Sequence, residues 1–156
     1  MRVGFLLDDA PVEIEVPEDQ MLVETLRALG RLSVRETCGI GVCGACTVLV
    51  GGEPASGCLL LTAQVEGKSV TTVDGLAGDD PVLAAFTATH AFQCGWCTPG
   101  MVLTVKALLA GGAAPDREEA AEALGGNLCR CGCYSRILDA VELAAHQDPS
   151  RSSKEP

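Results

Sequence analysis

The chain has 156 residues, of which 47% are hydrophobic but only 3% aromatic, so its core must be built from small aliphatic side chains. Its formal net charge of −10 argues against a nucleic-acid-binding protein, because phosphate contacts need a basic face. Nine cysteines, an odd number, exclude a complete set of intramolecular disulfides, and no apolar run reaches the length of a membrane span. Because Met1 leads into Asp8-Asp9 and not into the apolar core of a signal peptide, we expect a cytoplasmic protein with a solvated acidic surface.

The first half of the chain has the pattern of short strands around one helix. Residues 3–7 form an apolar run and residues 12–16 alternate apolar with polar, which predicts two strands joined by a turn at Asp8-Asp9. Residues 17–29 carry leucines at helical spacing, and Gly30 is a plausible stop. Further strands are expected over residues 47–50, 58–61 and 69–73, with a hairpin turn at Gly51-Gly52.

The second half, beyond Gly75, has a helical pattern. Asp80 and Asp116 each occupy an N-cap position before a helical stretch, and Pro81 suits a first helical turn. The tail over residues 147–156 is polar, and we expect it to be disordered. Helices are expected over residues 82–92, 98–109, 116–124 and 134–145.

Eight of the nine cysteines fall into two sets of four. The first set has the spacing C-x4-C-x2-C with a distant fourth cysteine, which is the spacing of plant-type [2Fe–2S] proteins. The second set has one C-x2-C pair and one C-x-C pair. Two clusters in a small chain indicate a carrier of single electrons. The sets are Cys38, Cys43, Cys46 and Cys58, and Cys94, Cys97, Cys129 and Cys131.

Zinc is the alternative occupant. The spacing of the second set, taken alone, could hold a zinc ion, and the C-x2-C pairs of the two sets could together form a four-thiolate zinc site. The latter arrangement leaves Cys38 and Cys58 without a role. The glycines at 39, 41 and 44 favour a cluster in the first loop, because a loop around an inorganic core needs backbone conformations that side chains block.

Three motifs resemble the iron–sulfur small subunit of molybdenum hydroxylases, the family of xanthine dehydrogenase, aldehyde oxidoreductase and aerobic carbon monoxide dehydrogenase. They occur in the family's order and the resemblance covers residues 2–145. The motifs are Cys38-Gly-Ile-Gly-Val-Cys43-Gly-Ala-Cys46-Thr, Gln93-Cys-Gly-Trp-Cys-Thr-Pro-Gly-Met101 and Gly126-Asn-Leu-Cys-Arg-Cys131.

The resemblance implies an α+β protein with two domains, each holding one [2Fe–2S] cluster. Residues 1–76 would form a β-grasp, ferredoxin-like domain whose cluster, bound by the first cysteine set, lies near a flavin. Residues 77–146 would form a four-helix domain whose cluster, bound by the second set, lies near a molybdopterin. The resemblance also implies that Gln93 and Cys131 contact this pterin; without it, Gln93 would be interpreted as an ordinary amide at a helix end.

One segment departs from the family pattern. The family usually has Cys-Arg-Cys-Thr-Gly-Tyr where this chain has Cys129-Arg-Cys131-Gly132-Cys133-Tyr134. In an extended segment Cys129, Cys131 and Cys133 could all point the same way, so Cys133 could replace Cys131 as a ligand. We expect it not to, because Tyr134 begins the last helix and Cys133 would lie at its cap.

The sequence therefore predicts an electron-transfer subunit of a heteromeric, molybdenum-dependent oxidoreductase. Its partners would be a molybdopterin-binding large subunit and an FAD-binding medium subunit, with no nucleic acid and no membrane span. We expect no catalytic residue in this chain, because it contains no evident catalytic triad, carboxylate pair or nucleotide-binding loop. The alternatives are a free-standing carrier with two clusters and a zinc-binding interaction module.

Overall fold

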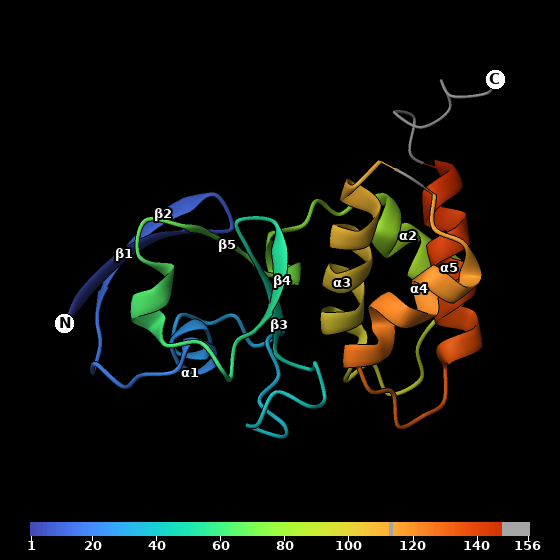
Figure 1. Ribbon diagram of the computed structural model, residues 1–156. Helices are drawn as coiled ribbons and strands as arrows, with labels where there is room; N and C mark the ends of the chain where they lie inside the picture. The colour runs from blue at the N-terminus through green and yellow to red at the C-terminus, as the bar shows by residue number, and fades with distance from the viewer. Residues whose placement is uncertain (113, 148–156) are drawn as a thin grey trace.

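The computed structural model describes residues 1–112 and 114–147, and it combines one five-stranded mixed sheet with five α-helices (Figure 1). The strand order in the sheet is β2-β1-β5-β3-β4. The strands are β1 (Arg2–Leu7), β2 (Ala10–Glu15), β3 (Thr47–Val50), β4 (Glu53–Ser56) and β5 (Ser69–Thr71). The helices are α1 (Leu22–Ala28), α2 (Pro81–Ala88), α3 (Thr98–Ala110), α4 (Arg117–Ala123) and α5 (Tyr134–Gln147).

The sheet consists of two antiparallel hairpins with β5 between them. Strands β1 and β2 pair antiparallel across a turn in which Asp8 and Asp9 have φ angles of 50° and 65°. Successive positive φ values are typical of the two-residue turns whose twist matches a hairpin. Strands β3 and β4 form the second hairpin, and β5 lies between the two, parallel to β1 and antiparallel to β3. The turns of both hairpins lie where the sequence pattern predicts them, but strand β4 was not predicted.

Helix α1 begins later than the leucine spacing suggests. Residues 17–20 form a turn in which Gln20 N–H donates to the Pro17 carbonyl oxygen, and the helix starts only at Leu22. The Glu24 carboxylate accepts from the backbone N–H of Met21 at 3.1 Å, as in a capping box. Leu22 and Leu26 are fully buried, and burying a leucine stabilises a fold by about 1.5–3 kcal/mol.

The strand expected over residues 58–61 was wrong. In the described part of the chain this segment makes one isolated bridge, between Leu61 and Met21. Carbonyl oxygens in this segment and next to it accept hydrogen bonds from the start of α1 instead. The Leu60 carbonyl accepts from Leu22 N–H at 2.7 Å, and the neighbouring Gly57 carbonyl accepts from Val23 N–H at 3.0 Å. The first N–H groups of a helix have no partner within the helix, so this segment satisfies them and is not free to join the sheet.

Helix α2 is also shorter than expected, because the chain reverses at His90. This residue has a φ of 50°, and Ala91 N–H donates back to the Phe86 carbonyl oxygen at 3.0 Å. A left-handed residue followed by such a hydrogen bond is a common helix end. The starts of α3, α4 and α5 agree with the sequence pattern, whereas the tail over 148–156 lies outside the described residues.

The apolar residues form two cores, and α3 belongs to the second. One core lies between the sheet and α1 and includes Cys46 and Cys58; the other lies among the helices and includes Cys129 and Cys133. Figure 1 shows α3 between the sheet and the other helices, with the β3–β4 hairpin beside it. Within the described ranges, no helix combines the length and the apolar character needed to cross a bilayer.

Candidate metal centres

The first cysteine set is centred on the loop between α1 and β3. Cys38, Cys43 and Cys46 lie on this loop, and Cys58 lies on the turn that follows β4. The loop is closed at its base by a hydrogen bond from the Arg35 N–H to the Ala45 carbonyl oxygen at 3.1 Å. The thiols approach one another in pairs, Cys38 with Cys43 and Cys46 with Cys58.

The two pairs differ in their electrostatic surroundings. Backbone N–H groups of Ile40, Cys43 and Val42 point at the Cys38 sulfur and lower the pKa of this thiol to about 6. Cys46 is 2% exposed, and burial raises its pKa to about 11. Amide N–H groups directed at a sulfur stabilise negative charge on it, whether it is a free thiolate or a metal ligand.

The second set joins two loops of the helical part. Cys94 and Cys97 lie between α2 and α3, and Cys97 is the N-cap residue of α3. Cys129 and Cys131 lie in the loop before α5. The thiols again lie close together: the Cys131 and Cys94 sulfurs are 3.5 Å apart, and the Cys97 thiol lies beside Cys129, which the Cys133 thiol also approaches.

Backbone amides and burial also shape this second set. The Trp96 N–H lowers the pKa of the exposed Cys94 thiol, whereas burial raises the pKa of Cys97 to about 12. Burial opposes ionisation of Cys129, but the Cys133 N–H and the Cys97 thiol donate to its sulfur and leave its pKa lowered. Each set therefore contains thiols whose negative charge the backbone already stabilises.

The paired arrangement fits a centre with two metal ions. In residues 1–112 and 114–147, no three histidine, cysteine or carboxylate side chains converge on a point that could hold one ion. A [2Fe–2S] core presents two irons, each of which needs two protein ligands, and two thiol pairs per set supply that number. A cavity of about 430 Å³, lined in part by Cys43, Cys94, Cys97 and Cys129, adjoins the second set.

Cys133 is buried beside the second thiol set. Its side chain is 4% exposed and packs in the helical core, and burial raises its pKa. Ile137 N–H donates to the Cys133 carbonyl oxygen, which places this residue at the start of α5. Its own N–H donates to the Cys129 sulfur at 3.5 Å. The Cys133 thiol therefore lies in the helical core and beside the Cys129 sulfur, whereas the sulfur that lies 3.5 Å from Cys94 is that of Cys131.

Gln93 and Cys131, the two residues expected to contact a pterin, lie together at the surface. The Gln93 side-chain amide is exposed, and its Nε2 is 3.5 Å from the Cys131 carbonyl oxygen. This distance is at the outer limit of a hydrogen bond, so the amide keeps its donors and acceptor available to another molecule. The two residues come from different loops, 38 positions apart.

Sequence reasoning missed side chains that support the cysteine loops. The Trp96 indole N–H donates to the Thr37 hydroxyl at 2.9 Å, and the Arg35 guanidinium lies 4.8 Å from the centre of the indole ring. The Tyr134 hydroxyl accepts from the Cys129 N–H at 2.8 Å. Arg35 and Thr37 have no spacing that would single them out, because their partner is on a loop about 60 residues away.

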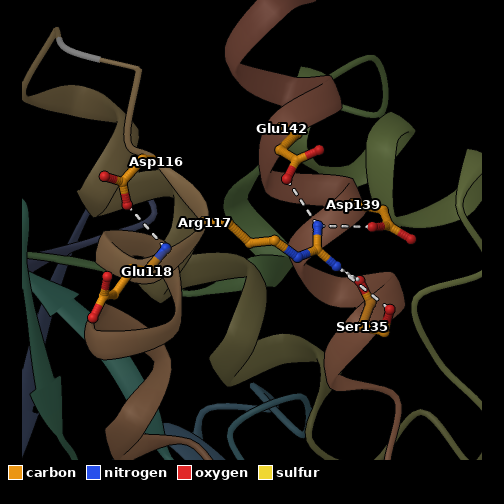
Figure 2. A network of polar contacts seen from close by, with 6 residues as sticks. All are labelled: Asp116, Arg117, Glu118, Ser135, Asp139 and Glu142. Carbon is orange, nitrogen blue, oxygen red and sulfur yellow. Dashed lines mark hydrogen bonds and ion pairs between the residues drawn. The ribbon is translucent and has the colours of Figure 1, made fainter.

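Arg117 connects the two helices that flank the loop containing Cys129 and Cys131. Figure 2 shows Arg117, at the start of α4, reaching across to α5. Its guanidinium lies 2.9 Å from Asp139 and 2.8 Å from Glu142, and it donates to the Ser135 carbonyl oxygen at 3.2 Å. Each such exposed ion pair contributes only about 0.2–1 kcal/mol, but together they join the helices before and after the loop.

Two family models match the chain. One, described as a 2Fe-2S iron-sulfur cluster binding domain, matches residues 5–76. The other, described as a [2Fe-2S] binding domain, matches residues 72–142. Together they cover the sheet and most of the helical part.

Relatives similar over nearly their whole length are subunits of multi-subunit oxidoreductases. The nicotinate dehydrogenase small FeS subunit of Eubacterium barkeri is 43% identical over 151 residues, 94% of this chain and 96% of that protein. The xanthine dehydrogenase iron-sulfur-binding subunit of Escherichia coli O157:H7 is 39% identical over 150 residues, 90% and 92% of the two chains. Quinoline 2-oxidoreductase from Pseudomonas putida 86 has a solved chain that matches with a TM-score of 0.88 and 39% identity, covering 97% of this chain and 93% of that one.

In the iron-free chain, we expect Cys38 to be alkylated faster at pH 7 than Cys46 or Cys97. With a pKa of about 6, Cys38 is mostly thiolate at that pH, whereas pKa values of about 11 and about 12 keep the other two protonated. The Cys38 rate should fall as the pH drops through about 6, because the thiolate is then protonated. A short iodoacetamide pulse followed by peptide mass spectrometry measures all three, and equal rates for Cys38 and Cys46 would contradict this prediction.

Cys133→Ser should retain both metal centres, whereas Cys131→Ser should lose or severely perturb the second. The reason is geometric: the Cys131 sulfur lies 3.5 Å from Cys94, while the Cys133 thiol is buried in the core beside Cys129. Iron analysis and visible absorption of the two matched variants decide between the cysteines. The reverse pattern would assign the fourth ligand position to Cys133.

Proposed function

Because this chain belongs to the iron–sulfur small subunits of the molybdenum hydroxylases, we propose that it carries two [2Fe–2S] clusters that connect a molybdopterin site to a flavin. Its role is electron transfer, as a subunit of an oxidoreductase. The observation that carries the proposal is the convergence of eight cysteine thiols as four pairs. The proposed ligands are Cys38, Cys43, Cys46 and Cys58 for one cluster, and Cys94, Cys97, Cys129 and Cys131 for the other.

We further propose that the chain divides near residue 76. A ferredoxin-like, β-grasp domain over residues 1–76 would hold the first set, and a four-helix domain over residues 77–146 would hold the second. The two separate apolar cores support this division, since each contains cysteines of one set only. The ranges of the two family models, 5–76 and 72–142, meet at the same place.

When bound, each cluster would accept and release one electron at a time. The protein supplies two thiolates for each iron: Cys38 with Cys43, and Cys46 with Cys58, in the first set. Amide N–H groups around Cys38 and Cys94 point at sulfur and offset its negative charge. Such hydrogen bonds raise the reduction potential of an iron–sulfur centre.

The backbone provides a short connection between the two ligand sets. The N–H of Leu128 donates to the carbonyl oxygen of Cys43 at 2.9 Å, and Leu128 is bonded directly to Cys129. A ligand of the first set is therefore one hydrogen bond and one residue away from a ligand of the second. We propose that electrons pass between the domains along this connection.

The exposed residues of the second set support a direction of electron transfer. Cys94 is exposed, and Gln93 lies beside Cys131 at the same surface, so we propose that the molybdopterin-binding large subunit covers this surface. The FAD-binding medium subunit would then receive electrons from the first set. Substrate selection would lie in the large subunit, in agreement with the different substrates named for the relatives.

The purified protein should contain four iron atoms and four sulfides per chain, because each of the two thiol sets has ligands for two irons. The reduced protein should give two distinguishable paramagnetic signals, since the sets differ in burial and in N–H donors. Iron and sulfide analysis with electron paramagnetic resonance (EPR) tests this. Zinc in either set would support the interaction-module alternative, and full loading without associated molybdenum- and flavin-containing chains would support a free-standing carrier.

Gln93→Ala should leave both clusters in place but slow their reduction by substrate in the assembled enzyme by roughly 10- to 100-fold, the usual effect of losing a residue that supports a metal ligand. Gln147→Ala removes a similarly exposed amide at the end of α5 and serves as the control. Rapid-mixing spectroscopy of cluster reduction gives the rates. A wild-type rate for Gln93→Ala would remove this residue from the pterin contact.

A further inference from the structure

Asn127 has its buried side chain at the contact between the two cysteine loops. It lies two residues before Cys129, is 4% exposed, and belongs to no helix or strand. Its Nδ2 donates to the Gly44 carbonyl oxygen at 3.0 Å, and Gly44 lies in the first loop between Cys43 and Cys46. One side chain thus touches the backbone of both ligand loops, which are 83 residues apart in the sequence.

The neighbours of Asn127 allow only one orientation of its amide. The Gly44 carbonyl can only accept, and the Thr47 hydroxyl already donates to it at 2.8 Å, so the NH₂ group of Asn127 must face this pair. On the other side, the Thr104 hydroxyl of α3 donates to Asn127 Oδ1 at 2.9 Å. The amide therefore joins the first ligand loop, the start of β3, α3 and the second ligand loop.

The backbones around this amide are in direct contact. A Cβ atom on Gly100, in the first turn of α3, would overlap the Gly44 carbonyl oxygen. Gly44 has a φ of 66°, and a Cβ there would overlap both the Gly126 carbonyl oxygen and the Asn127 amide.

We propose that Asn127 is a positioning residue for electron transfer between the two clusters. Its side chain holds the loop that contains Gly44 against residues 127–129. It thereby maintains the hydrogen bond from Leu128 N–H to the Cys43 carbonyl oxygen. Within residues 1–112 and 114–147, the Asn127 side chain makes its hydrogen bonds to Gly44, Thr47 and Thr104 and none to a cysteine sulfur, so it acts through the backbone that it fixes. Electron tunnelling slows steeply as such a gap widens. The inference rests on the proposed function, since it needs both clusters.

Asn127→Ala removes the hydrogen bond from Asn127 to Gly44 and the one from Thr104 to Asn127. The Gly44 carbonyl oxygen then has one donor fewer. In the assembled enzyme we expect inter-cluster electron transfer to slow severalfold, because the tunnelling rate decays exponentially as the two clusters move apart. The magnetic coupling between the two reduced clusters should weaken in parallel. Rapid-freeze EPR follows both, because it resolves the signal of each cluster and their mutual splitting.

The matched control is Thr25→Val. Thr25 of α1 and Thr62 form a buried hydrogen bond at 2.7 Å, away from the contact between the two cysteine loops. This variant should lower Tm, as Asn127→Ala does, but leave the coupling and the inter-cluster rate at wild-type values. A purely structural role for Asn127 would make the two variants behave alike.

Iron analysis separates failure of this inference from failure of the proposed function. Wild-type protein with fewer than four irons would overturn the proposed function itself. Fully loaded Asn127→Ala with wild-type coupling and rate would overturn only the positioning role. If Asn127→Ala loses iron, Thr104→Val decides, because it removes the donor to Asn127 Oδ1 at similar side-chain volume: reduced coupling supports the role, and wild-type coupling overturns it.

Discussion

The contact between the two cysteine loops is the constraint on which the rest of the structure depends. At Gly44 the backbone of the first loop meets α3 and the residues before Cys129 so closely that Gly44 and Gly100 must both lack a side chain. The buried amide of Asn127 fills the remaining space and satisfies the polar groups there. A buried polar group without a partner is costly, so this contact exists in only one arrangement. It fixes where the sheet lies against α3.

Backbone groups, more than charged side chains, stabilise the negative charge that metal-bound thiolates would carry. The chain is acidic overall, with a net charge of −10, so its long-range field opposes further negative charge. Amide N–H groups pointing at Cys38 and Cys94 act locally against that field, and both thiols have lowered pKa values. The deeper thiols of each set, Cys46 and Cys97, are shielded by burial instead. Each set thus has an accessible, charge-stabilised side and a buried side anchored in a core.

Local sequence signals predicted elements well where local interactions decide them. The turn at Asp8-Asp9 and the N-cap at Asp80 are examples, since each depends on residues adjacent in the chain. The one strand that was predicted wrongly lies where a distant segment takes up the hydrogen bonds. Residues 58–61 were expected to pair as a strand, but the Leu60 carbonyl instead accepts from the first N–H of α1. Nothing within 58–61 carries that information.

The sequence alone determined the family, most of the element order and the two cysteine sets, because spacing and glycine content are typical of a loop around a metal core. Only the tertiary structure decided how the thiols pair, that Cys131 lies against Cys94 while the Cys133 thiol lies in the core, and that Asn127 bridges the loops. These features depend on contacts between segments that are tens of residues apart. The direction of a side chain at such a contact is set by the packing of α3 between the sheet and the helices, which no local pattern encodes.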